Sequence, residues 1–133
     1  MKPCAISGLL SGWLLCATLS GCQGPPPPKL APVRGQVKYK QKPLGGATVC
    51  FVPDFNKGNR NGHQATGQTD KDGSFTLETY PHGQGVMPGF YRVTCIVFGG
   101  VAVPQKYRNA MNTPLIFEVT EQGNENLVFN LSD

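Results

Sequence analysis

The feature that most constrains the fold is an alternation of apolar and polar residues along residues 33–131. At its start, Val33, Val37 and Tyr39 share one parity, and Arg34 stands on the other. Successive side chains of a β-strand point to opposite faces, so a period of two predicts strands with one buried face. Because each buried face must be covered, paired sheets satisfy this pattern and helices do not. The sequence therefore predicts an all-β fold.

Turns divide this pattern into about seven strands. The chain of 133 residues contains 17 Gly and 12 Pro, which is typical of many turns and few helices. The expected strands are residues 33–40, 47–52, 64–69, 74–80, 89–98, 115–121 and 126–131. Phe75 and Leu77 should point inward, and the apolar rows of the last two strands should face each other. These short strands predict one β-sandwich domain.

Five basic residues bunch near the start of this domain: Lys29, Arg34, Lys38, Lys40 and Lys42. Charges along one face of a strand are a common protection for an exposed sheet edge, and we interpret the row in this way. An anionic envelope surface or polymer is the alternative partner for the same residues. The net charge of the chain is only +4, which is too weak to predict nucleic-acid binding.

Residues 1–21 predict a lipoprotein signal peptide. Lys2 supplies a positive charge, and residues 6–18 form an apolar stretch shorter than the ~20 residues needed to span a bilayer. The sequence Leu19-Ser20-Gly21-Cys22 follows and resembles the lipobox of bacterial lipoproteins. Small residues give a peptidase access to the bond before Cys22, whose thiol can form a thioether to a glyceryl lipid. Cys22 is therefore the predicted lipidation site, and an ordinary secretory signal with an incidental cysteine is the alternative.

Residues 22–32 predict a proline-rich tether between the lipid and a folded domain at 33–133. Four consecutive prolines at 25–28 favour an extended polyproline II spacer, because proline has a fixed φ and no N–H donor. The acyl chains on Cys22 would hold the protein on a membrane of the cell envelope, facing the periplasm or the exterior. The resemblance to lipoproteins favours the outer membrane, because Gln23 and not Asp follows the cysteine.

Of the five cysteines, only Cys50 and Cys95 belong to the expected domain. An oxidising compartment permits a disulfide between them. Strand alternation opposes it, because Cys50 alternates with the core-like Val49 and Phe51, whereas Cys95 shares the face of Val93. Thiols on opposite faces of their strands cannot meet, so we predict that both stay unpaired.

Four segments occur in an order that resembles carboxypeptidase regulatory-like domains. They are VRGQV at 33–37, KPLGGATV at 42–49, TDKDGSF at 69–75 and PGFYRV at 88–93. The resemblance covers residues 33–132, which is nearly all of the expected domain. It implies a seven-stranded Greek-key sandwich of the transthyretin type, common in bacterial surface lipoproteins, that serves as an accessory or interaction module. It implies no reaction.

The sequence predicts neither a metal site nor another cofactor. Asp70-Lys71-Asp72-Gly73 is similar to the start of a calcium loop, but the twelfth position, which requires Glu, is Pro81. We interpret this segment as a tight turn. His63 and His82 are the two histidines of the chain, and they lie in separate loops with no carboxylate or cysteine at ligand spacing.

Two enzyme classes with similar sandwiches lack their defining residues here. An iron dioxygenase would need two tyrosines and two histidines; Tyr80, His82 and Tyr107 are present, but no His-x-His pair is. Hydroxyisourate hydrolases end in Tyr-Arg-Gly-Ser, whereas this chain ends in Asn130-Leu131-Ser132-Asp133. Another enzyme would require His63 and His82 to converge on one pocket. We predict no catalytic residue and no enzymatic activity.

The resulting expectation is a lipid-anchored, non-enzymatic module of the cell envelope. Its variable loops, chiefly 54–63 and 81–87, are the expected contacts with an envelope partner. A carbohydrate- or peptidoglycan-binding module is the alternative. No tryptophan remains in the expected domain, so Phe55, Tyr80 or Phe90 would have to stack on the sugar.

Overall fold

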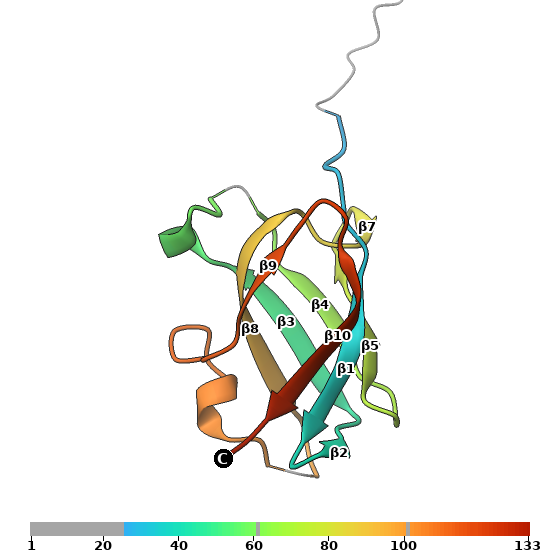
Figure 1. Ribbon diagram of the computed structural model, residues 1–133, viewed down its shortest axis with the longest axis vertical. Coiled ribbons are helices and arrows are strands. Elements are labelled where there is room, and N and C mark those ends of the chain that lie inside the picture. Colours follow the sequence, from blue (N-terminus) through green and yellow to red (C-terminus); the bar gives the residue numbers. More distant parts are fainter. Residues whose placement is uncertain (1–25, 61, 101) are drawn as a thin grey trace, which may run out of the picture.

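The computed structural model describes residues 26–60, 62–100 and 102–133 (Figure 1). This part of the chain is all-β. Its strands form two sheets, and its helical segments are the 3-10 turns η1 (Phe55–Lys57) and η2 (Gln105–Tyr107). The predicted signal peptide, Cys22 and the first residues of the tether lie outside the described residues.

The central strand of the smaller sheet is β1 (Val33–Tyr39). It pairs in parallel with β10 (Asn124–Leu131) and, along its other edge, antiparallel with β2 (Lys42–Pro43) and β5 (Ser74–Thr76). The prediction that the basic row protects a sheet edge is therefore wrong, because Arg34 lies on a strand that is paired on both sides. Alternation indicates which face of a strand is exposed to solvent. It does not indicate which strands pair along its edges, because these come from distant segments of the chain.

The larger sheet has the strand order β7-β6-β4-β3-β8-β9, and each neighbouring pair is antiparallel. Its strands are β3 (Ala47–Pro53), β4 (Ala65–Gln68), β6 (Glu78–Thr79), β7 (Gly83–Gln84), β8 (Gly89–Val97) and β9 (Ile116–Val119). Within it, β3 pairs with β8 along its whole length. The chain crosses between the sheets before β3, before β5, after β5 and again before β10.

A continuous segment of chain joins the two sheets along one side. Here β5 pairs with β1 in the smaller sheet, and β6 pairs with β4 in the larger sheet. Leu77 lies between them, fully buried, and donates its N–H to the Val33 carbonyl at 3.0 Å. Gly67 of β4 permits this approach, because a Cβ at this position would overlap the Thr76 carbonyl oxygen.

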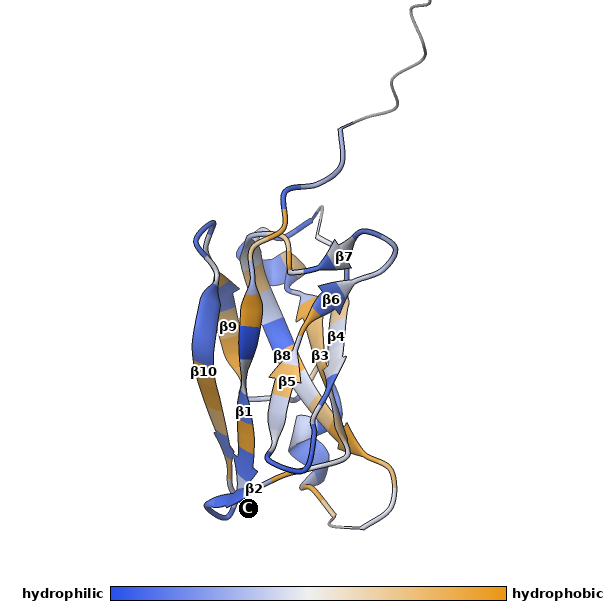
Figure 2. Cartoon of the chain, turned by 90° about the vertical axis from the view of Figure 1, so that its right-hand side faces the viewer, coloured by the Kyte–Doolittle hydropathy of each residue, from blue (hydrophilic) through white to orange (hydrophobic). Residues whose placement is uncertain are grey.

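Aromatic rings from both sheets meet in the core. The ring centroid of Phe51 lies 5.7 Å from that of Tyr91, 6.1 Å from that of Phe117 and 6.1 Å from that of Phe129. Phe75 points inward, as predicted, and stacks on Phe129 at 6.1 Å. Because Phe117 belongs to β9 and Phe129 to β10, the last two strands face each other across the core. Figure 2 shows the alternation of apolar and polar residues along β1 and β10.

The seven expected strands are all present, with small differences at their ends. The expected strand at 74–80 is divided between β5 and β6. The structure adds β2 and β7, which the alternation did not predict because two residues are too short to show a period. The all-β prediction is confirmed.

Cys50 and Cys95 are free, as predicted. Cys95 packs in the core, whereas Cys50 lies on the outer side of β3, with its Sγ 2.6 Å from Nε2 of Gln64. In the β3–β8 register Cys50 lies opposite Thr94, and Val49 lies opposite Cys95. The two thiols therefore lie on opposite faces of one sheet.

The predicted turn at residues 70–73 is also confirmed. Asp70 Oδ1 accepts hydrogen bonds from the backbone N–H groups of Asp72 (2.8 Å) and Ser74 (3.0 Å). Gly73 has a φ of 76°, which a side chain would strain. The carboxylate of Asp70 is therefore occupied by the backbone of its own turn.

Candidate functional site

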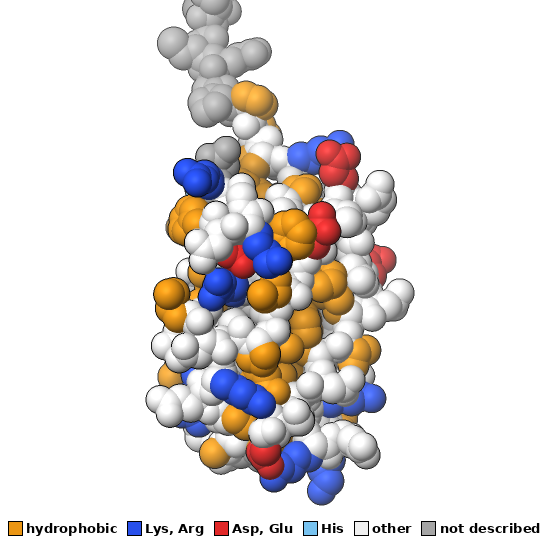
Figure 3. Space-filling model, turned by 60° about the vertical axis from the view of Figure 1, so that its left-hand side comes forward, with side chains coloured by type: hydrophobic (Ala, Val, Ile, Leu, Met, Phe, Trp, Pro, Cys, Tyr) orange, Lys and Arg blue, Asp and Glu red, His pale blue; other side chains and the backbone are white. Residues whose placement is uncertain are grey.

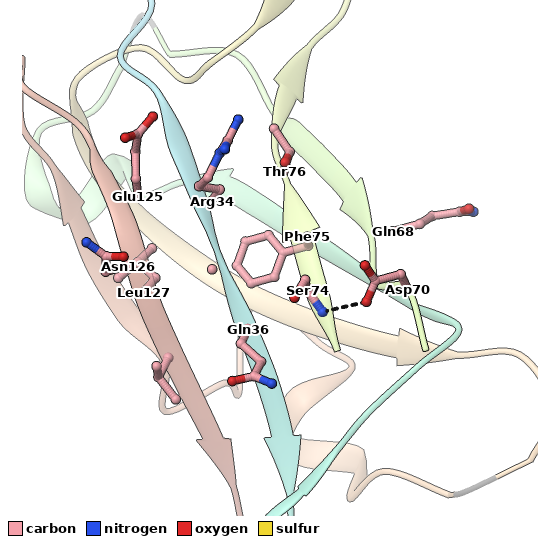
Figure 4. A pocket seen from close by; sticks show the side chains of 12 residues that line it. Arg34, Gln36, Gln68, Asp70, Ser74, Phe75, Thr76, Glu125, Asn126 and Leu127 are labelled. Carbon is pink, nitrogen blue, oxygen red and sulfur yellow. Dashed lines mark hydrogen bonds between the residues drawn. The ribbon is translucent and has the colours of Figure 1, made fainter. Parts of the chain in front are cut away.

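An open hollow of about 640 Å³ lies on the outer face of the smaller sheet (Figure 4). Three neighbouring strands, β10, β1 and β5, form its floor and present their outward side chains to it. Its lining residues are Arg34, Gly35, Gln36, Gln68, Asp70, Ser74, Phe75, Thr76, Glu125, Asn126, Leu127 and Val128. The side chains that reach it are mostly polar, because the apolar members of the same strands point into the core.

A β-bulge concentrates polar groups at one edge of the hollow. Val33 pairs with Asn124, but Gly35 pairs with Leu127, so β10 carries one extra residue in this interval. Bulges re-aim side chains. Here two consecutive residues, Glu125 and Asn126, are both exposed and both line the hollow.

Close approach of β1 and β10 at the floor requires glycine. A Cβ built on Gly35 would lie 2.5 Å from the carbonyl oxygen of Leu127. Because that oxygen belongs to the backbone, it cannot rotate away as a side chain could. Glycine at position 35 therefore allows β1 and β10 to lie close together at the floor of the hollow.

The polar side chains of the hollow divide into two groups. Gln36 donates to the Asp72 carbonyl at 2.8 Å, and Asp70 is held by its turn, so these groups support the scaffold. Arg34, Glu125 and Asn126 make no side-chain hydrogen bond and no ion pair among the described residues. Their guanidinium, carboxylate and amide groups offer donors and acceptors to a polar ligand.

The two loops expected to contact a partner meet at one end of the molecule, near η1 and β7. Asn59 is buried; its Nδ2 donates to the Phe90 carbonyl at 2.9 Å, and its Oδ1 accepts from the N–H of Gly62 at 3.0 Å. The rings of His63 and His82 lie 5.5 Å apart, centroid to centroid. The two histidines belong to separate loops, as predicted, and the structure brings these loops side by side.

A buried ion pair fixes the base of the first loop. Asp54 is 2% exposed; its Oδ1 accepts from Asn56 N–H at 3.1 Å, and its Oδ2 lies 3.4 Å from Arg92 Nε. That second oxygen has no hydrogen bond within the described residues, so the ion pair alone compensates it. Arg92 Nη1 also donates to the Ala110 carbonyl at 3.1 Å and the Met111 carbonyl at 3.3 Å. Arg92 thus joins two loops, and no motif or spacing in the sequence predicts this contact.

The proline-rich segment enters the fold at this same end (Figure 1). Ala31 and Val86 exchange two backbone hydrogen bonds, each of 2.8 Å, and both side chains are buried. The Pro32 carbonyl accepts from Asn124 N–H at 2.9 Å. The chain therefore leaves the folded part next to the loops 54–63 and 81–87.

Comparisons with family models, curated proteins and solved structures find no match for this chain. Among the described residues, no helix has the length and apolar character needed to cross a membrane, and no three His, Cys, Asp or Glu side chains gather as metal ligands. The predicted lipidation site, Cys22, lies outside the described residues.

The three aromatic residues considered for sugar stacking lie away from the hollow. Phe55 and Tyr80 are 63% and 89% exposed, whereas the hollow is lined by neither of them nor by Phe90. The alternation in the sequence predicts which side chains of β1 point outward. It does not predict which residues of β5 and β10 lie beside them, because no local sequence signal indicates strand register or a bulge.

Proposed function

We propose that this protein is a lipid-anchored, non-enzymatic module of the cell envelope, carried on the membrane by a lipid on Cys22. The observation that supports it is the position of the chain entry: residues 26–30 form no strand or helix, and the fold begins where Ala31 pairs with Val86. A tether followed at once by a folded domain is what a lipoprotein display module requires.

The length of the tether limits how far the anchored domain can lie from the membrane. The nine residues from 23 to 31 reach at most about 30 Å when fully extended. The end that carries η1 and β7 would therefore stay within about 30 Å of the lipid. The C-terminus lies at the opposite end of the domain (Figure 1).

Anchoring is tested by labelling cells with radioactive palmitate and separating membrane from soluble fractions. Wild type should carry label and sediment with membranes, the outer membrane being the expected fraction. The variant Cys22→Ser should lose the label. A Cys22→Ser protein that is still labelled, or an unlabelled wild type, contradicts the proposal.

The loops 54–63 and 81–87 are the proposed contacts with an envelope partner, because they converge and exposed aromatic side chains lie beside them. Phe55 belongs to the first loop, and Tyr80 directly precedes the second. A double variant Phe55→Ser/Tyr80→Ser removes both aromatic contacts. Phe98→Ser is the matched control, since Phe98 is 82% exposed and follows the other end of β8. Pull-down from detergent-solubilised envelopes should recover a partner with wild type and control but not with the double variant. Equal recovery by all three contradicts these contacts.

A second candidate function, glycan or peptidoglycan binding, is favoured by the hollow. Arg34, Glu125 and Asn126 supply the planar polar groups that bind sugar hydroxyls. In sedimentation with purified cell-wall sacculi, Arg34→Ala and Asn126→Ala should release the protein, whereas Arg60→Ala, at the loop end, should not. Sedimentation that is equal in all variants, or absent in wild type, excludes the hollow as a glycan site.

We also propose that the fold is the seven-stranded Greek key of carboxypeptidase regulatory-like, transthyretin-type domains. Support comes from the sequence segments at 33–37, 42–49, 69–75 and 88–93, and from a chain that crosses repeatedly between two sheets. An experimental structure that matches a member of this family over both sheets is the test. A different strand order in that structure overturns the assignment.

A further inference from the structure

The two histidines of the chain form an exposed pair at the loop end. His63 precedes β4, and His82 lies in the turn between β6 and β7. Their ring centroids are 5.5 Å apart with an interplanar angle of 61°, and both residues are exposed. Neither histidine lines the hollow on the smaller sheet, so neither belongs to the proposed glycan site.

Strand pairing explains why the two rings meet. Thr66 of β4 lies opposite Glu78 of β6 in an antiparallel register. Continued past these strands, the register brings residues 62–64 beside residues 80–82. The turn that presents His82 is closed by a hydrogen bond from its N–H to the Thr79 carbonyl at 2.7 Å. His63 thus lies two residues before β4, and His82 is held by the backbone of its own turn.

We propose that His63 and His82 bind one divalent transition-metal ion. Imidazole nitrogen is a good ligand for Cu²⁺, Ni²⁺ and Zn²⁺. An ion that binds one nitrogen of each ring at ~2.0–2.1 Å, with the ligands about 90–120° apart, requires centroids roughly 4.5–5.5 Å apart. The observed centroid distance of 5.5 Å lies at the upper end of this range, so the spacing of the two exposed rings fits one shared ion.

The site is open, with two ligands from the protein. Within the described residues no third His, Cys, Asp or Glu completes the set, so water or an external ligand takes the remaining positions. Binding should follow the order of intrinsic affinities, with Cu²⁺ tighter than Ni²⁺ and Zn²⁺. The pair does not depend on the lipid anchor.

The test is calorimetric titration of the full chain, purified in detergent without a polyhistidine tag, with Cu²⁺, Ni²⁺ and Zn²⁺. The thiols of the chain can also bind these metals. The result is therefore the difference in metal affinity between wild type and each histidine variant. Loss of a second-shell partner alone weakens metal sites roughly 10–100-fold, so His63→Gln and His82→Gln should each weaken binding at least about tenfold. Gln84→Ala, in the same hairpin, is the control and should bind as wild type.

Spectroscopy of the copper-bound protein reports on both rings separately. Sub-stoichiometric Cu²⁺ should broaden the imidazole proton resonances of both histidines together, and the electron paramagnetic spectrum should show two coupled nitrogens. Each single variant should retain one. Binding that is unchanged in both variants, or broadening of only one ring, overturns the proposal. The pair then represents ring packing alone.

Discussion

The outer faces of the two sheets differ in what their side chains do. On the larger sheet, Arg92 is engaged with Asp54 and with the loop at 104–113, and Gln64 covers Cys50. On the smaller sheet, Arg34 and Asn126 stand free of side-chain partners among the described residues. One outer face holds the molecule together, and the other is available to a ligand.

Surface composition supports the same distinction. Apolar side chains gather across the middle of the side that carries β8, β9 and η2 (Figure 3). Met111 and Ile116, which are 78% and 46% exposed, belong to this side. Eight of the twelve residues that line the hollow of the smaller sheet are polar or charged. The outward side chains of the two sheets therefore differ in chemistry. Those of the larger sheet, such as Arg92, contact the molecule's own loops, whereas Arg34 and Asn126 of the smaller sheet make no side-chain hydrogen bond or ion pair among the described residues.

Substitution in the core that both sheets share should have the largest effect. Phe51 is fully buried and contacts three other aromatic rings. Phe51→Ala should lower the free energy of unfolding by about 4 kcal/mol, measured by urea denaturation. Val128→Ala, on the polar outer face and 50% exposed, is the control and should change it by less than about 0.5 kcal/mol. Similar losses in both variants would contradict the assignment of the core.

The next effect should come from the outer face of the larger sheet. Arg92→Leu leaves the buried Asp54 carboxylate without its cation, which should cost about 3 kcal/mol in the free energy of unfolding. The double variant Asp54→Asn/Arg92→Leu should recover part of this loss, because no buried charge remains. The single variant Asp54→Asn completes the cycle. If the loss of unfolding free energy in the double variant equals the sum of the losses in the two single variants, the pair is not coupled.

On the smaller sheet, the sharpest test is Gly35→Ala. The added Cβ would lie 2.5 Å from the Leu127 carbonyl oxygen, so β1 and β10 must separate. We expect a loss of about 2 kcal/mol in the free energy of unfolding, within the usual range for overpacking. Asn126→Ala, on the same face, should be nearly neutral for stability. If Gly35→Ala is equally neutral, the two strands pack less closely than described.

The smallest effect concerns the thiols on the two faces of the larger sheet. Burial raises the pKa of the Cys95 thiol from its ordinary value of 9.0 to about 11. Burial also raises the pKa of Cys50, while hydrogen bonds from Gln64 and Thr94 lower it in part. A thiol reagent should therefore react with Cys50 before Cys95 in the folded protein.

The raised pKa of Cys95 also predicts a pH dependence. The folded state keeps the proton that the unfolded state releases, so stability is fully present below pH 9 and falls as the pH rises toward 11. Thermal unfolding between pH 8 and 11 measures this, and Cys95→Ala should show a shallower decline. Equal slopes in the two proteins would refute the role of Cys95, because Tyr91, whose pKa burial also raises, is present in both.

Much of the fold could be predicted, and little of the candidate site. The inward positions of Phe75 and Leu77 and the unpaired thiols followed from parity alone. The edge position expected for β1 was wrong, because its partner β10 comes from the far end of the sequence. The hollow depends on the pairing of β1 with β10 and on the bulge at Glu125 and Asn126, so the sequence could not predict it either.

The sequence by itself determined the strands, their buried faces and the turn at 70–73, because each depends on the geometry of a few consecutive residues. Tertiary structure alone decided which strands are neighbours, how Arg92 meets Asp54, and that His63 lies beside His82. These contacts join segments far apart in the chain, and their formation depends on register and on packing against the whole core.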